Sequence, residues 1–257
     1  MSNEGDNLTF WEHLDELRGT LLRIIGVTVL FGIGAFCFKE LLFDIVLAPS
    51  KSDFLTYHLM QRIGVESGSS DFSVNLINIE LAQQFIIHMK MALYAGLFCA
   101  LPYILYALLR FLIPALGDKQ RRYTSIFIAC GYIMFIVGVA VCYFVIFPLT
   151  LRFLATYQVS SEVANMISLK SYISTFAGMN VALGLVFELP VLCWLLAMLG
   201  VMKSQFMRDY RRYAIVVILV LAAIITPTSD AFTLALVALP MWLLYEASIR
   251  VVAIAER

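Results

Sequence analysis

The sequence predicts an all-α integral membrane protein with six transmembrane helices. Hydrophobic residues make up 61% of the 257 residues and charged residues only 14%, against about 45–50% and about 25% in soluble domains. Long apolar runs without charges alternate with short polar segments, as expected for spans of about 20 residues. We therefore interpret residues 1–257 as a single transmembrane domain, and the formal net charge of zero argues against a nucleic-acid-binding surface.

The first half of the chain predicts three of these spans. A polar N-terminal stretch carries a short amphipathic helix over residues 9–18, whose apolar residues recur at helical spacing. The first span follows at 21–38. The second, at 85–112, contains Pro102 and should be kinked there, and the third covers 123–149.

The second half predicts three more spans, at 172–199, 213–226 and 231–249. The last two are short, because about 15–17 apolar residues cover only about 23–26 Å of a hydrocarbon core about 30 Å thick. Either the bilayer thins around them or they form a re-entrant hairpin. We favour two short spans.

The distribution of basic residues predicts the orientation of the six spans. One side would hold residues 1–20, 113–122, 200–212 and 250–257, and the other, periplasmic or outer, side would hold 39–84, 150–170 and 227–230. Of the 18 Lys and Arg residues, twelve fall on or near the first side. The excess of positive charge predicts that this side, with both termini, is cytoplasmic.

Glu188 is the one charged residue in the run from 171 to 202. An acid near the bilayer centre costs about 2.5–3.5 kcal/mol on insertion scales, and such residues are functional by default. Asn180, Gly184 and Glu188 share one helical face of small and polar residues, which should point at protein or a water-filled cavity. Pro190 should open the helix beside the acid. The alternative is an acid that only hydrogen-bonds a neighbouring helix.

The acidic N-terminal stretch is a second candidate site. Asp15 and Glu16 precede Arg18, on the side where positive charge is the rule. A carboxylate there could bind a guanidinium ligand bidentately. The alternative is a solvated face on which Asp15 and Arg18 pair at i, i+3.

No catalytic or metal-binding motif appears in the chain, and the five cysteines lie in apolar runs without metal-ligand spacing. Neither the H-E-x-x-H nor the G-x-S-x-G pattern occurs, and no Walker sequence is present. The sequence therefore predicts a protein that is not an enzyme and that needs neither a metal ion nor a cofactor.

Five short motifs occur in an order that resembles one known family. They are His13-Leu14-Asp15-Glu16-Leu17-Arg18, Ala48-Pro49, Phe111-Leu112-Ile113-Pro114-Ala115-Leu116, Phe187-Glu188-Leu189-Pro190, and Thr226-Pro227 with Asp230. Together they resemble TatC, the multispan receptor subunit of the twin-arginine protein translocase. The resemblance covers nearly the whole chain and agrees with six spans and cytoplasmic termini.

The resemblance implies a function in protein transport. Such proteins bind signal peptides that carry a consecutive arginine pair on folded precursors. They work in the cytoplasmic membrane, in homo- or hetero-oligomers with small single-span subunits of the TatA and TatB type. The proton-motive force drives transport of the folded protein.

The resemblance also implies site residues. Glu16, with Arg18 beside it, matches one acid of the arginine-pair site. The second acid falls at Gln120, a neutral acceptor and weaker arginine partner, for which Asp118 or Asp15 would have to substitute. Glu188 matches the family's intramembrane acid, which contacts partners on a concave face.

Phe111 and Pro49 match further positions linked to function, and Asp230 belongs to the last motif. The competing hypothesis is a proton-coupled small-solute transporter that uses Glu188 as the proton carrier. The lack of an internal repeat counts against it.

Overall fold

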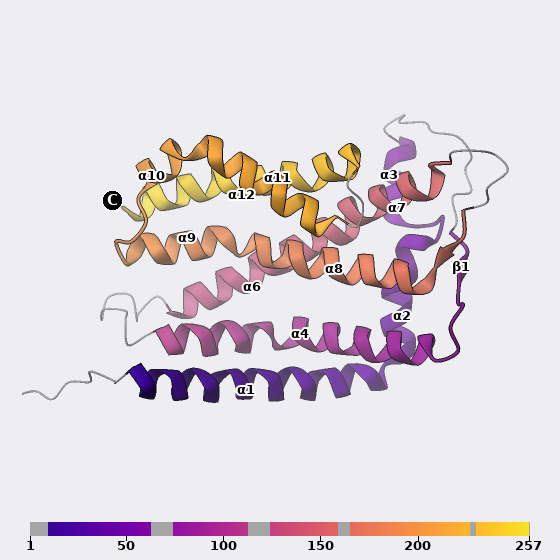
Figure 1. The fold of residues 1–257 in the computed structure, drawn as a ribbon, viewed down its shortest axis with the longest axis horizontal. Helices are drawn as coiled ribbons and strands as arrows, with labels where there is room; N and C mark the ends of the chain where they lie inside the picture. The colour runs from indigo at the N-terminus through magenta and orange to yellow at the C-terminus, as the bar shows by residue number, and fades with distance from the viewer. Residues whose placement is uncertain (1–9, 63–73, 113–123, 159–164, 227–229, 257) are drawn as a thin grey trace, which may run out of the picture.

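The computed structural model describes residues 10–62, 74–112, 124–158, 165–226 and 230–256. Five helical runs within these residues are long and apolar enough to cross a membrane, namely Leu14–Cys37, Gln83–Phe111, Thr124–Thr156, Leu169–Met198 and Ala231–Ala255. They lie side by side as an elongated bundle (Figure 1). The protein is therefore mostly helical, as predicted.

The helices and strands in chain order are α1 (Phe10–Cys37), α2 (Lys39–Leu47), the 3₁₀ turn η1 (Ala48–Ser50), α3 (Leu55–Arg62), β1 (Leu76–Ile77), α4 (Gln83–Leu112), α6 (Thr124–Val141), the π-helical turn η3 (Cys142–Ile146), α7 (Phe147–Thr156), β2 (Ile167–Ser168), α8 (Leu169–Phe187), α9 (Leu189–Met198), α10 (Ser204–Asp209), α11 (Arg211–Ile225) and α12 (Ala231–Ala255).

The bundle has two ends, which we name after the helices that lie there (Figure 1). The α2 end carries α2, α3, β1 and α7. The α10 end carries α10, the beginning of α1 and the end of α12. The first and last described helices therefore begin and end at the same end of the bundle, and the hairpin of α11 and α12 turns back before it reaches the level of α2.

The N-terminal region differs from the sequence prediction. We expected a separate amphipathic helix over 9–18 and a span from Leu21, but α1 is one continuous helix from Phe10 to Cys37. The apolar spacing of the short helix continues into the span, and a single glycine, Gly19, does not break a helix. Asp15, Glu16 and Arg18 are consequently rigid extensions of the first span.

The third span also runs further than predicted, to Thr156 instead of residue 149. The reason lies at Pro148, which has no N–H to donate and crowds the preceding turn. The chain widens there into the π turn η3, where the Phe147 N–H donates to the Cys142 carbonyl. One inserted residue lets the helix pass the proline without ending.

Of the two spans that were predicted to be short, only one is short. The fifth is short, because α11 has 15 residues and a length of about 22 Å. The prediction of a short sixth span ending at 249 is wrong: α12 has 25 residues and a length of about 37 Å. Its extra turns are held by Ile249 and Val252, which pack into a small core with Ala197 and Met207.

A small strand pair departs from the all-α prediction. β1 pairs with β2 in parallel, Leu76 opposite Ile167 and Ile77 opposite Ser168. Strands of two residues show no alternating pattern in the sequence, and this pair joins segments far apart in the chain. It ties the connection before α4 to the start of α8.

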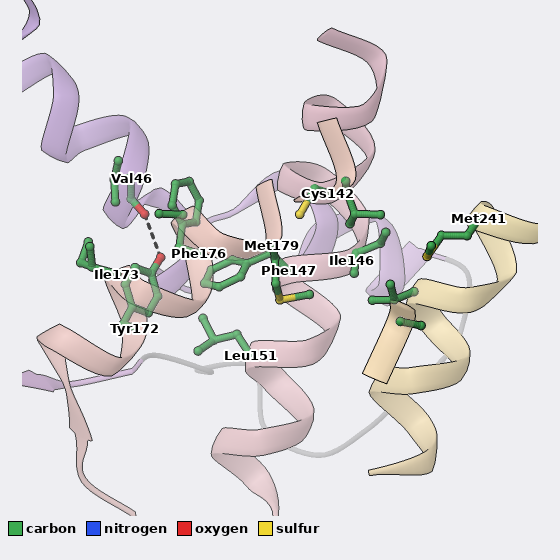
Figure 2. Packing of buried hydrophobic residues seen from close by; sticks show 14 of the residues in the cluster. Val46, Cys142, Ile146, Phe147, Leu151, Tyr172, Ile173, Phe176, Met179 and Met241 are labelled. Carbon is green, nitrogen blue, oxygen red and sulfur yellow. Dashed lines mark hydrogen bonds between the residues drawn. The ribbon is translucent and has the colours of Figure 1, made fainter. Parts of the chain in front are cut away.

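The main hydrophobic core joins α2, α4, η3, α7 and α8 to α11 and α12 (Figure 2). The ring of Phe147 packs edge-on against Tyr172 and Phe176, with centroid distances of 5.3 and 5.0 Å. The Tyr172 hydroxyl donates to the Val46 carbonyl at 2.8 Å. This core fixes α2 across the end of the bundle.

Pro49 and Tyr57 continue this closure at the α2 end. The Tyr57 hydroxyl donates to the Pro49 carbonyl at 2.8 Å, and both residues are buried. Burial raises the pKa of Tyr57 above its ordinary range, so the hydroxyl stays protonated and remains a donor. Pro49 therefore has an architectural position, in the turn that follows α2.

Candidate functional site

The two helices that carry the predicted recognition residues pack with their backbones in contact. A Cβ atom added to Gly96 on α4 would lie 2.5 Å from the Gly32 nitrogen and 2.6 Å from the Thr28 carbonyl oxygen on α1. Only a residue without a side chain fits there, as in other close helix crossings in membranes. Two glycines therefore set the spacing of α1 and α4.

A pocket of about 130 Å³ lies between these helices at the α10 end. Its lining residues are Glu16, Thr20, Arg23, Tyr103, Tyr106, Ala107, Arg110 and Phe111. Glu16 is exposed and forms no salt bridge with another described residue. The predicted acid thus stands open in a polar pocket, beside the predicted Phe111.

Arg23 and Arg110 place two guanidinium groups in the same pocket as Glu16. Arg23 folds back along α1, because its Nη2 atom lies 3.6 Å from where a Gly19 Cβ would be. The pocket therefore combines one carboxylate, two guanidinium groups and two tyrosine rings.

The pocket as a whole was not predicted from the sequence, although its residues follow a recognisable pattern. Glu16, Thr20 and Arg23 follow the spacing i, i+4, i+7 on α1. Tyr103, Ala107 and Arg110 follow the same spacing on α4. Each set therefore shares one face of its helix. The sequence did not indicate that these two faces pack against each other.

The remaining predicted recognition residues either lie outside the pocket or fall outside the described part of the chain. Asp15 and Arg18 are exposed on α1 and do not line the pocket. They form no salt bridge with each other, so the alternative i, i+3 pair does not form between these two described residues. Gln120 and Asp118 lie outside the residues that the structure describes.

Glu188 lies where α8 and α9 meet, and it is 6% exposed. It ends α8 and begins α9. Its carbonyl accepts from the N–H groups of Val191 and Leu192 at 3.1 and 3.0 Å. Pro190 stands in the first turn of α9, where its missing N–H costs nothing. The predicted opening of the helix beside the acid is confirmed.

The carboxyl group of Glu188 packs against α6. A Cβ atom added to Gly131 would lie 2.9 Å from its Oε2 atom and 3.0 Å from the Leu105 Cδ1 atom of α4. The Oε1 atom is buried and has no hydrogen-bond partner among the described residues. An unpaired buried polar atom is costly, so a missing partner is expected at this point.

Asn180 and Gly184 lie on the same face, as predicted, and that face points at protein. Phe135 of α6 covers Gly184, where an added Cβ would lie 2.5 Å from the ring. The Asn180 Nδ2 donates to the Phe176 carbonyl at 2.8 Å, and its Oδ1 has no partner among the described residues. The two residues pack within the bundle and do not share a pocket with Glu16.

Asp230 has a structural position at the start of α12. Its Oδ1 atom accepts from the Thr233 N–H at 2.8 Å, and Oδ2 accepts from the Thr233 hydroxyl. This is the N-cap of a helix. The geometry therefore gives Asp230 a structural role, as the cap of α12.

A family model described as Sec-independent protein translocase protein (TatC) matches residues 12–240 of the chain. The chain belongs to the TatC family. The TatC protein of Blattabacterium sp. subsp. Periplaneta americana is 33% identical over 257 residues, covering 97% of this chain and 96% of the relative. That of Koribacter versatilis is 34% identical over 245 residues, covering 95% and 84%.

A solved structure, described as the crystal structure of the twin-arginine translocase receptor TatC, superposes with a TM-score of 0.76. It is 32% identical and covers 96% of this chain and 100% of the other. The chain is thus a multi-pass membrane protein and a component of a protein translocase, and it is not an enzyme. The family leaves the small-solute transporter hypothesis without support.

Proposed function

We propose that this chain is the signal-peptide receptor of a twin-arginine translocase in the cytoplasmic membrane. The observation that carries the proposal is Glu16, an exposed carboxylate without a salt bridge to any described residue, in a polar pocket of the α10 end. A carboxylate so placed suits an arginine from the peptide, because it accepts the two parallel hydrogen bonds of a guanidinium.

The orientation that we propose has six spans, with α11 as the short one and both termini in the cytoplasm. Arg208, Arg211 and Arg212 lie at the α10 end, together with Arg18. This excess of positive charge supports a cytoplasmic α10 end. The pocket would then face the compartment from which folded precursors come.

The resident arginines define what a peptide must do to enter the pocket. Arg23 and Arg110 give it, with Glu16, a formal charge of +1. An incoming arginine is therefore favoured only where it contacts the Glu16 carboxylate. The rings of Tyr103 and Tyr106 offer further faces for a guanidinium.

Glu188 has a different part in this proposal. Its unpaired Oε1 atom supports a hydrogen bond from a partner helix, such as that of a small single-span subunit of the TatA or TatB type. The site would then serve assembly and transport, driven by the proton-motive force, in a homo- or hetero-oligomer. Capture of the peptide would remain with Glu16.

The test is binding of a twin-arginine signal peptide to the purified full chain in detergent. Glu16→Ala should weaken binding about two- to fivefold, the upper range for an exposed ion pair. Gln120→Ala should cost less, because an amide is the weaker arginine partner. The matched control is Asp209→Asn, an exposed acid at the α10 end outside the pocket. Wild-type affinity in Glu16→Ala would refute the assignment.

A further inference from the structure

A second pocket, of about 400 Å³, lies at the α2 end between α2 and the beginnings of α4 and α8. Lys39, Phe43 and Leu47 line it at every fourth position of α2. Gln84 and His88 line it from α4, and Leu169 lines it from α8. It lies apart from the Glu16 pocket, at the opposite end of α1 and α4.

Its depth in the bilayer follows from the ends of the candidate spans. The first ends at Cys37, the second begins at Gln83 and the fourth begins at Leu169. All three bounds adjoin the pocket. The pocket therefore lies where three candidate spans begin or end, which is the level at which a bilayer places its headgroups.

His88 is held rigidly in the wall of this pocket. It is 8% exposed. Its ring stacks on Phe36 with a centroid distance of 4.0 Å and an interplanar angle of 13°, and Phe43 lies 5.7 Å away. The Nε2 atom is buried without a hydrogen-bond partner among the described residues. Such a group calls for a ligand atom.

The charge at the pocket favours an anion. Lys39 lines the pocket and forms no salt bridge with another described residue. Among the nearby acids, Glu80 forms a salt bridge with Lys170 at 2.8 Å. Glu40 and Asp44 are exposed on α2 and do not line the pocket. Lys39 and His88 thus line the pocket without a carboxylate among the lining residues.

We propose that this pocket binds an anionic phospholipid of the outer leaflet. The phosphate accepts hydrogen bonds from Lys39 and His88 Nε2, and the first carbons of an acyl chain lie along Phe43, Leu47 and Leu169. A lipid fits better than free phosphate, because more of the exposed wall is apolar than polar. The bound lipid would brace α2 against α4.

The experiment measures phosphatidylglycerol binding to the delipidated full chain by native mass spectrometry. Lys39→Gln should lower the affinity about fivefold, the effect of one basic residue at an anionic surface. His88→Phe, which keeps the stacking on Phe36, should lower it by a similar factor. Lys39→Arg should keep it. The control is Lys51→Gln, an exposed lysine at the same end and outside the pocket, which should bind as wild type.

Three results would overturn the proposal. An equal loss in Lys51→Gln would mean unspecific attraction between a charged surface and lipid. Equal binding of phosphatidylcholine would mean that the headgroup charge is not read. Displacement of the lipid by equimolar inorganic phosphate would mean a free-anion site. The thermal unfolding temperature without lipid should be the same in Lys39→Gln and the wild type. This measurement distinguishes a loss of lipid binding from misfolding of the variant.

Discussion

Two carboxylates, Glu16 and Glu188, lie in opposite surroundings. Glu16 stands exposed at the α10 end among arginine and tyrosine side chains. Glu188 is 6% exposed and packs on Gly131, with one oxygen unpaired among the described residues. The first can exchange ligands with water at low cost, whereas the second already carries the cost of desolvation.

This difference indicates a division of labour within one bundle. An exposed acid suits a ligand that arrives from water and leaves again, because surface ion pairs are weak and reversible. A buried unpaired acid suits a partner already in the membrane, since a hydrogen bond there recovers a penalty already incurred. The predictions below test whether the two sites can be separated.

The largest expected effect is at Glu188. Glu188→Ala should lower transport of a folded precursor about tenfold or more, the factor for one lost hydrogen bond to a charged group. Peptide capture should change less than about twofold, because Glu188 does not line the Glu16 pocket. Transport into membrane vesicles and peptide affinity are measured on the same variant. A parallel loss of capture would contradict the division.

The packing of α1 on α4 gives the next effect. Gly96→Ala should destabilise the protein by about 1–3 kcal/mol, because the new methyl group meets backbone atoms that cannot move aside. The separation of α1 from α4 should also weaken peptide capture. Thermal unfolding and peptide affinity are the measurements. Gly34→Ala is the control, since an added Cβ there has nothing within 4 Å; equal effects would show that helix spacing is unimportant.

A smaller effect is expected at Gly131. The added methyl group would meet two flexible side-chain ends, Glu188 Oε2 and Leu105 Cδ1, so both can shift and the cost should stay at about 1 kcal/mol. Displacing the carboxylate should lower transport and leave capture unchanged. Gly178→Ala on α8, where an added Cβ has nothing within 4 Å, should leave both unchanged. A loss of peptide capture in Gly131→Ala would contradict the separation of the Glu16 and Glu188 sites.

The sequence predicted the helices well because apolar runs and charge are local properties. The polar face of Asn180, Gly184 and Glu188 was recognised from a 100° rotation per residue. What escaped was pairing between segments: the small parallel strand pair, and the shared pocket of Glu16 on α1 and Arg110 on α4. Such neighbours depend on which helices touch, and one sequence carries no direct record of that.

Helix ends were the other weak point, for a physical reason. A proline predicts a break, but Pro148 is absorbed by a π turn. The sixth span was expected to end at 249, but Val252 beyond it is buried against a neighbouring helix. At Pro148 a local backbone adjustment outweighs the signal for a helix end, and at Val252 tertiary packing does so.

The smallest effect concerns a third acid, Glu256, at the α10 end. Its carboxylate accepts from the Ser204 N–H at 2.7 Å and the Ser204 hydroxyl at 2.6 Å. The hydroxyl, then the N–H, lowers the pKa of Glu256 below its ordinary value. A lowered pKa means that this stabilisation is present above the unfolded pKa of about 4.3 and is lost as the pH falls through the folded value.

The prediction is a small Tm deficit in Glu256→Gln at neutral pH that closes on acidification below the ordinary Glu range. The exposed Glu40, at the other end of the bundle, gives the control Glu40→Gln, which should show a smaller Tm deficit at neutral pH. A deficit that persists in acid would mean that the ionised carboxylate is not what holds α10. If the deficit closes as expected, the ionised Glu256 carboxylate is what holds the start of α10 through Ser204.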